Sequence, residues 1–196
     1  MDPITLRRWR NLQYWDPAAK LRKLRAAERE IIEQIGDAEL EPGARDVLSL
    51  RTNETKDWRQ WRDAALFTYG MGLAQGMKIG FAPLEDDDYD FVAAWVDGDT
   101  AHFCPVQLKE LPPADRNAEL TVEGLLRNLP TKYGPTQTVL AVRLSRAGQV
   151  NLDRDWPRVP FAQLWFFWAS APASAEFSIY GDALETPRQW AFDYPE

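Results

Sequence analysis

Cysteine and histidine are almost absent from this chain of 196 residues, which has one of each. The single cysteine, Cys104, cannot form a disulfide within the chain, and there is no set of Cys and His residues for a structural zinc site. A Ser-His-Asp or Cys-His mechanism would depend entirely on His102. The composition therefore argues against both of these enzyme classes.

Long apolar runs are also missing. No run approaches the roughly 20 residues that span a bilayer, and no apolar stretch follows the basic N-terminus as a signal peptide requires. Together with the scarcity of cysteine, this predicts a cytoplasmic protein that does not enter a membrane. Apolar residues still make up 45% of the chain, which at this length is enough for the core of one ordinary domain.

Positive charge is in deficit overall but concentrated near the N-terminus. The net charge is −7, yet residues 1–30 carry eight basic and four acidic side chains, so this segment is +4 and the remainder is −11. A basic segment can follow a phosphate backbone even on an acidic protein, because the field depends on where the charges lie. A solvated helix face is the alternative interpretation. The residues that we expect near a nucleic-acid face are Arg22, Lys23, Arg25 and Arg29.

Aromatic residues gather in two places. Trp9, Tyr14 and Trp15 interleave with the first arginines, a pattern that fits either contact with a single nucleic-acid strand or packing on the body of the same chain. The run from Trp165 to Trp168 is aromatic throughout and is predicted to lie in the core.

The first part of the chain, residues 1–77, is predicted to be helical. Asp16-Pro17 is a typical helix start, with Asp as the cap and Pro in the first turn. A longer helix is expected over residues 58–77, where small residues such as Gly70 allow a sheet to pack closely.

The hydrophobic period changes after Met77. The Asp97-Gly98-Asp99 turn predicts a hairpin, and a helix at 120–129 separates it from later strands. The predicted strands are 78–84, 90–96, 100–111, 137–144, 161–168 and an edge strand at 177–180. The fold class is therefore α/β with a mixed sheet. We expect an N-terminal helical arm at 1–55 and an α/β domain at 56–196, which together form one compact unit.

Polar residues meet at one end of the predicted hairpin. Asp90 begins a hydrophobic strand, and Gln107 and Lys109 close the returning one. Residues 107 and 109 share one face of that strand, while Leu108 points to the other. Since Asp90 lies 17 residues before Gln107, the hairpin brings the start of one strand beside the end of the next. We expect a carboxylate, a carboxamide and an ammonium group at one edge of the sheet.

These groups suit metal-assisted hydrolysis of a phosphodiester. Mg²⁺ or Mn²⁺ prefers hard oxygen ligands, which Asp90, the Gln107 amide oxygen and the Leu108 backbone carbonyl can supply. Lys109 would orient or deprotonate the attacking water, or pair with the scissile phosphate.

The same residues resemble the PD-(D/E)XK phosphodiesterase superfamily, the restriction-endonuclease-like nucleases, over roughly residues 56–168. The resemblance implies an αβββαβ core and metal-dependent cleavage of DNA. By position, Asp90 matches the family's metal-binding Asp, Gln107 its second acid and Lys109 its catalytic Lys. Gln107 departs from the usual acid and removes one negative charge from the metal site. Tyr89 replaces the usual Pro before the Asp.

The resemblance leaves two functions open. The superfamily also contains inactive relatives, so the alternative to a nuclease is a non-catalytic interaction protein, a subunit of a nucleic-acid-processing or defence complex that binds a protein partner or a second copy of itself. Many members place a Glu in the helix before the first strand. The sequence does not choose among the acids available for this role, which are Glu30, Glu33, Glu54, Asp57 and Asp63. Pro105 predicts a bulge or an edge position in its strand.

Overall fold

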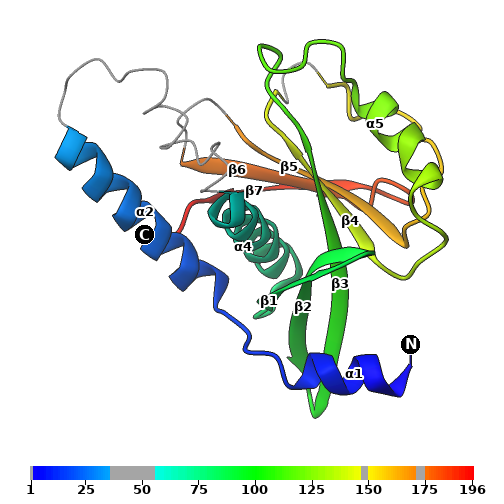
Figure 1. The fold of residues 1–196 in the computed structure, drawn as a ribbon, viewed down its shortest axis with the longest axis horizontal. Coiled ribbons are helices and arrows are strands. Elements are labelled where there is room, and N and C mark those ends of the chain that lie inside the picture. The colour runs from blue at the N-terminus through cyan, green and yellow to red at the C-terminus, as the bar shows by residue number, and fades with distance from the viewer. Residues whose placement is uncertain (1, 36–55, 147–149, 171–174) are drawn as a thin grey trace.

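The computed structural model describes residues 2–35, 56–146, 150–170 and 175–196 (Figure 1). Within these ranges the chain forms a mixed sheet of seven strands with helices on both faces. The helices are α1 (Pro3–Arg10), α2 (Pro17–Ile35), α4 (Lys56–Gln75) and α5 (Val122–Asn128), and the short 3-10 turn η2 (Leu129–Thr131) follows α5. The strands are β1 (Gly80–Asp86), β2 (Tyr89–Asp97), β3 (Thr100–Leu111), β4 (Val139–Leu144), β5 (Gln163–Ala169), β6 (Glu176–Gly181) and β7 (Arg188–Asp193). None of the described helices is both long and apolar enough to cross a membrane.

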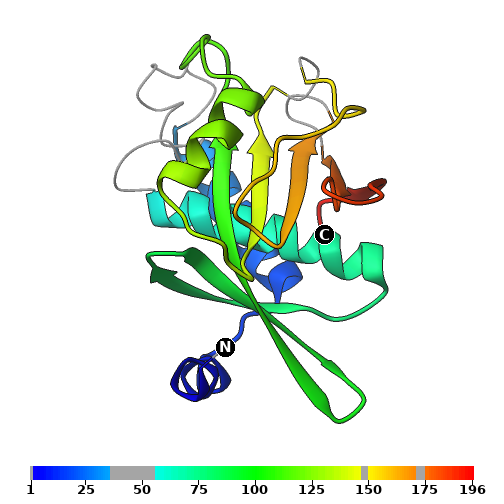
Figure 2. The ribbon, with the colours of Figure 1, turned by 90° about the vertical axis from the view of Figure 1, so that its right-hand side faces the viewer.

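The strands lie side by side in their order along the chain, from β1 to β7. Two neighbouring pairs in this sheet are parallel, β3 with β4 and β4 with β5. Parallel pairing requires a crossover connection, and α5 lies in the connection between β3 and β4. Helix α4 covers one face of the sheet and α5 the other, while α2 lies on the outer side of α4 (Figures 1 and 2). The α/β class, the mixed sheet and the β2–β3 hairpin confirm the sequence predictions. From α4 to β4 the elements follow the order αβββαβ, and β3 also pairs with β4.

The prediction that residues 177–180 form an edge strand was wrong. Strand β6 is an inner strand, since β7 pairs along it from Glu176↔Asp193 to Gly181↔Arg188. In β7 only the three residues from Trp190 to Phe192 are apolar, and only Phe192 of the strand is buried, so its hydrophobic signal is weak.

The β2–β3 hairpin is regular and turns at Gly98, whose φ of +56° is the left-handed conformation that glycine adopts without strain. Pro105 is paired with Val92, in the part of β3 that precedes the first residue paired with β4, Val106. Pro105 therefore has a strand neighbour on one side alone, which agrees with the predicted edge position.

Two large apolar clusters lie on the two faces of the sheet, and a smaller one forms around Trp9. The first is closed by α4 and includes Leu21, so α2 contributes to the main core. The second lies under α5 and includes Phe166. The early aromatics are used for packing: Trp9 is 2% exposed and donates a hydrogen bond to the Tyr89 hydroxyl over 3.2 Å, and Trp15 packs edge-on against Phe81.

Helix α4 approaches β7 closely at Gly70. A Cβ atom at this position would lie 2.6 Å from Cε1 of Phe192. The Phe192 ring is 6% exposed and is held by Tyr69 and Phe177, with centroid separations of 5.9 and 5.8 Å. The glycine is therefore required for the packing of this helix on the sheet.

We predict that Gly70→Ala lowers the free energy of unfolding by about 1–3 kcal/mol, since overpacking outweighs the helix propensity of alanine, worth about 1 kcal/mol. Gly134→Ala is the matched control, because a Cβ there meets no atom within 4 Å. Urea denaturation of both variants measures the difference. Adding Phe192→Leu should recover part of the loss in Gly70→Ala, and a Gly70→Ala variant that is more stable than wild type would contradict this packing.

Candidate active site

Asp90 and Gln107 meet where β2 begins and β3 ends. Phe91 is paired with Val106, so the residues just before and just after this pair lie on one face of the hairpin. The Asp90 carboxylate accepts hydrogen bonds from the Gln107 side-chain amide and, over 2.6 Å, from the Leu108 backbone N–H. Gln107 is 4% exposed, so its amide is held in a largely dry environment.

A third donor comes from α4, where Gln60 Nε2 lies 3.1 Å from the other Asp90 oxygen, Oδ1. An acid was expected in this helix from the sequence, whereas the α4 residue that reaches Asp90 is Gln60. Asp63 instead forms an ion pair with Arg143 on β4, and Asp57 is exposed. Glu54 lies outside the described residues. The other two acids, Glu30 and Glu33, are exposed on α2.

The Lys109 ammonium is held by a tyrosine that the sequence analysis also missed. Its Nζ donates a hydrogen bond to the Tyr133 hydroxyl over 2.9 Å and lies 5.3 Å from the centre of the Tyr133 ring. Tyr133 follows η2, and its ring packs on Phe161 with the centroids 5.2 Å apart. Lys109 therefore lies on the predicted face of β3, and its ammonium is anchored on the α5 side of the sheet.

The predicted metal ligands lie close together, and the arrangement fits a cation held by few protein groups. Gln107 Nε2 contacts both Asp90 Oδ2 and, over 3.2 Å, the Leu108 carbonyl oxygen. A half-turn of the terminal amide would bring the Gln107 oxygen to the same point. Within the described ranges no three His, Cys, Asp or Glu side chains form a metal-binding group. One carboxylate is compatible with Mg²⁺, which keeps several waters and often binds through one or two carboxylates and substrate phosphates.

The basic residues of α2 form a separate surface. Arg22, Lys23 and Arg29 are exposed, and Arg22 donates a hydrogen bond to the C-terminal Glu196 over 3.3 Å. The Arg25 guanidinium lies 5.2 Å from the centre of the Tyr194 ring. Because α2 lies on the outer side of α4, the structure does not bring these residues together with Asp90 (Figures 1 and 2).

The remaining candidates have structural surroundings. His102 stacks on Trp95 with ring centroids 5.1 Å apart and an interplanar angle of 10°. The Cys104 thiol lies 3.7 Å from the Pro105 carbonyl oxygen, and burial raises the pKa of this thiol to about 11. Cys104 is therefore a protonated thiol near neutral pH rather than a nucleophilic thiolate.

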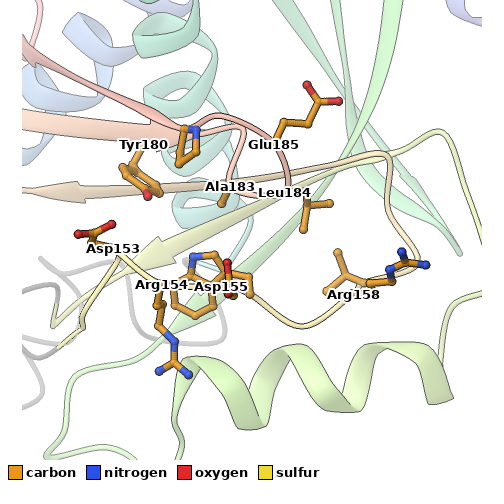
Figure 3. A pocket seen from close by; sticks show the side chains of 11 residues that line it. Asp153, Arg154, Asp155, Arg158, Tyr180, Ala183, Leu184 and Glu185 are labelled. Atoms are coloured by element: carbon orange, nitrogen blue, oxygen red, sulfur yellow. The ribbon is translucent and has the colours of Figure 1, made fainter.

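A cavity of about 800 Å³ lies apart from these residues, between the loop that precedes β5 and the loop that joins β6 to β7 (Figure 3). Its wall is charged, and Figure 3 shows Arg154 and Glu185 on opposite sides of it. Arg154 forms an ion pair with Glu123 of α5, and the Tyr180 hydroxyl donates to the Leu152 carbonyl over 3.0 Å. None of the residues predicted to carry chemistry lines this cavity.

Comparisons of this chain with protein-family models, with curated proteins and with solved structures find no match.

The contact between Asp90 and residue 107 can be tested by Gln107→Glu. The change replaces a hydrogen-bond donor with a second carboxylate, so without a divalent ion the free energy of unfolding should fall by about 1–3 kcal/mol at pH 8. The loss should shrink as the pH falls toward 5, because a proton bound by the carboxylate pair restores a donor. Thermal unfolding at both pH values, with and without Mg²⁺, measures these effects.

Mg²⁺ should raise the melting temperature of Gln107→Glu more than that of the wild type, because two carboxylates bind a cation more strongly than one. Gln75→Glu, an exposed change on α4, is the matched control and should respond as the wild type does. An equal response to Mg²⁺ in wild type and Gln107→Glu would show that residue 107 does not contact the ion.

Proposed function

We propose that this protein is a divalent-metal-dependent nuclease of the restriction-endonuclease-like type, which hydrolyses phosphodiester bonds of DNA in the cytoplasm. The observation that carries the proposal is the convergence of the Asp90 carboxylate, the Gln107 amide and the Leu108 carbonyl at one point of the β2–β3 hairpin. Lys109 lies two residues after Gln107 on the same face of β3.

The order of elements supports the proposal independently of the site. The segment from α4 to β4 has the order αβββαβ, β1, β2 and β3 are antiparallel neighbours, and β4 is parallel to β3. This is the core that the resemblance to the PD-(D/E)XK nucleases implies.

In this proposal each side chain has a distinct role. Asp90, Gln107 and the Leu108 carbonyl would hold Mg²⁺ or Mn²⁺, and the bound ion would acidify water and offset phosphoryl charge. Gln60 keeps the Asp90 carboxylate oriented through its hydrogen bond to Oδ1. Tyr133 holds the Lys109 ammonium until a phosphate or an attacking water accepts a hydrogen bond from it.

One observation favours a second function, a non-catalytic interaction protein with the same fold that binds a protein partner or a second copy of the chain. The Gln107 amide donates hydrogen bonds to Asp90 Oδ2 and to the Leu108 carbonyl oxygen, the same two oxygens that would bind a metal. The Asp90 carboxylate therefore has hydrogen-bond donors from protein groups alone. A site of this kind is stable with no cation and needs no catalytic role.

Two substitutions separate catalysis from metal binding. Lys109→Ala should reduce Mg²⁺-dependent cleavage at least about 100-fold and leave binding of the ion and of DNA nearly unchanged, since Lys109 acts on the water or on the transition-state charge. Asp90→Asn should weaken both cleavage and metal binding, because it removes the fixed charge of the site. Cleavage of plasmid and of labelled single- and double-stranded oligonucleotides, with calorimetry for metal binding, provides the measurements.

Lys132→Ala is the matched control, because Lys132 is exposed and precedes Tyr133 directly. It should cleave as the wild type does. If the wild type shows no Mg²⁺- or Mn²⁺-dependent cleavage of any of these substrates, the interaction protein becomes the better assignment.

The role of α2 in DNA binding is tested by neutralising Arg22, Lys23 and Arg29 with glutamine. If each contacts a phosphate, the slope of log affinity against log salt should fall by about one unit per residue. Fluorescence anisotropy with a labelled duplex, measured over a range of salt concentrations, gives this slope.

A control with the same change in net charge uses three exposed residues away from α2: Lys78, Arg158 and Arg188. Changing these three to glutamine should leave the slope nearly unaltered. Unchanged affinity and slope in the α2 variant would refute a role for this helix.

A further inference from the structure

A second cavity, of about 270 Å³, lies between the C-terminal half of α4 and the sheet, on the opposite face from α5. Its lining comes from α4, the segment before β1, and strands β2 to β5. This lining includes no Asp, Glu, Lys or Arg. The lining includes Phe67, Met71, Trp95, Val139 and Trp165. The absence of charged groups from this wall disfavours an ionic ligand.

One polar group of this wall has no partner. Thr68 is 1% exposed, and among the described residues its hydroxyl makes no hydrogen bond. A helical threonine usually satisfies its hydroxyl on the carbonyl one turn earlier, and it divides between two χ1 rotamers in helices. Rotation about χ1 therefore suffices to redirect the Thr68 hydroxyl without moving the helix.

Of the other polar side chains in the wall, Gln75 is exposed to solvent, and Cys104 and Gln163 each have a described partner. The Cys104 thiol contacts the Pro105 carbonyl oxygen, and the Gln163 side-chain oxygen accepts a hydrogen bond from Trp165 Nε1 over 3.0 Å. Among the described residues of the wall, Thr68 therefore carries the one fully buried side-chain oxygen or nitrogen with unused hydrogen-bonding capacity. Met77, which is 39% exposed, lies on the rim, where its flexible side chain can adapt to an entering molecule.

We propose that this cavity binds an uncharged, mainly apolar small molecule whose single hydroxyl or carbonyl group pairs with Thr68. A cavity of about 150 Å³ holds benzene, so by proportion this one accommodates about ten to twelve non-hydrogen atoms. Buried apolar walls with a few directed polar groups are the usual composition of ligand sites. The proposal concerns the α4 face of the sheet and does not depend on nuclease activity.

The test uses three alkylbenzene probes of similar size: 4-butylphenol, butylbenzene and 4-propylbenzoate. The chain has three methionines, and two of them, Met71 and Met77, line the cavity. In protein labelled with ¹³C at the methionine methyls, 4-butylphenol and butylbenzene should shift the Met71 and Met77 signals saturably, with Met1 as the reference. 4-Propylbenzoate should bind at least about tenfold more weakly, since its charge would be desolvated.

Two variants make the test specific. Ala93→Leu fills the cavity and should abolish both shifts. Thr68→Val should weaken the binding of 4-butylphenol about fivefold relative to the binding of butylbenzene, which is the effect expected for one net hydrogen bond. Thr131→Val, an exposed change, is the matched control and should bind as the wild type does. Thr68→Val should also raise the melting temperature of the free protein, because it removes a buried hydroxyl that has no partner.

The proposal is overturned by any of three results. One is the lack of saturable methionine shifts with 4-butylphenol in the wild type. Another is undiminished binding by a folded Ala93→Leu variant. The third is an equal effect of Thr68→Val on 4-butylphenol and butylbenzene, which would show that Thr68 does not recognise the polar group.

Discussion

The hydrogen bonds of the Asp90 carboxylate fix the position of the β2–β3 hairpin relative to helix α4. A partly buried carboxylate is costly unless it is hydrogen-bonded, and its described donors come from three different sources: the Gln60 side chain, the Gln107 side chain and the Leu108 backbone. The register of β2 on β3 and the position of α4 must both be correct for these bonds to form. A slip of one residue in the hairpin would turn Gln107 to the other face of the sheet and break them.

Helix α4 is tied to the sheet at two points by residues on one of its sides. Gln60 reaches Asp90 on β2, and Asp63, one turn later, forms an ion pair with Arg143 on β4. Arg62 extends toward α2, where it lies 3.6 Å from Glu28. Polar contacts thus orient the N-terminal half of α4, while its C-terminal half packs through apolar and small residues. The small residues include Gly70, which lets α4 approach the Phe192 ring, and the apolar cavity lies beside this second half.

The parts of the fold that depend on local sequence could be predicted, and the parts that depend on distant contacts could not. Alternating hydrophobicity and the Asp97-Gly98-Asp99 turn were sufficient for the hairpin, and a period of two residues put Gln107 and Lys109 on one face. Gln60 and Tyr133 were missed because a glutamine in a helix and a tyrosine in a loop have no local pattern, and their roles appear only when α4 and η2 pack on the sheet. Strand β7 was missed because its apolar run, from Trp190 to Phe192, is only three residues long. The charge of α2 could be counted from sequence, but its position on the outer side of α4 could not.

Glutamine at position 107 alters how the proposed site would work. Its amide satisfies Asp90 when no cation is bound, so the hairpin can fold without the repulsion that two adjacent carboxylates would create. A cation must then displace a hydrogen bond to a charged group, which is worth about 1.5–3 kcal/mol, and it gains one negative ligand rather than two. The protein groups alone would hold Mg²⁺ weakly, and a DNA phosphate would supply the missing charge. In the proposed nuclease, metal binding and substrate binding would therefore be coupled, and the site would be complete when DNA is bound.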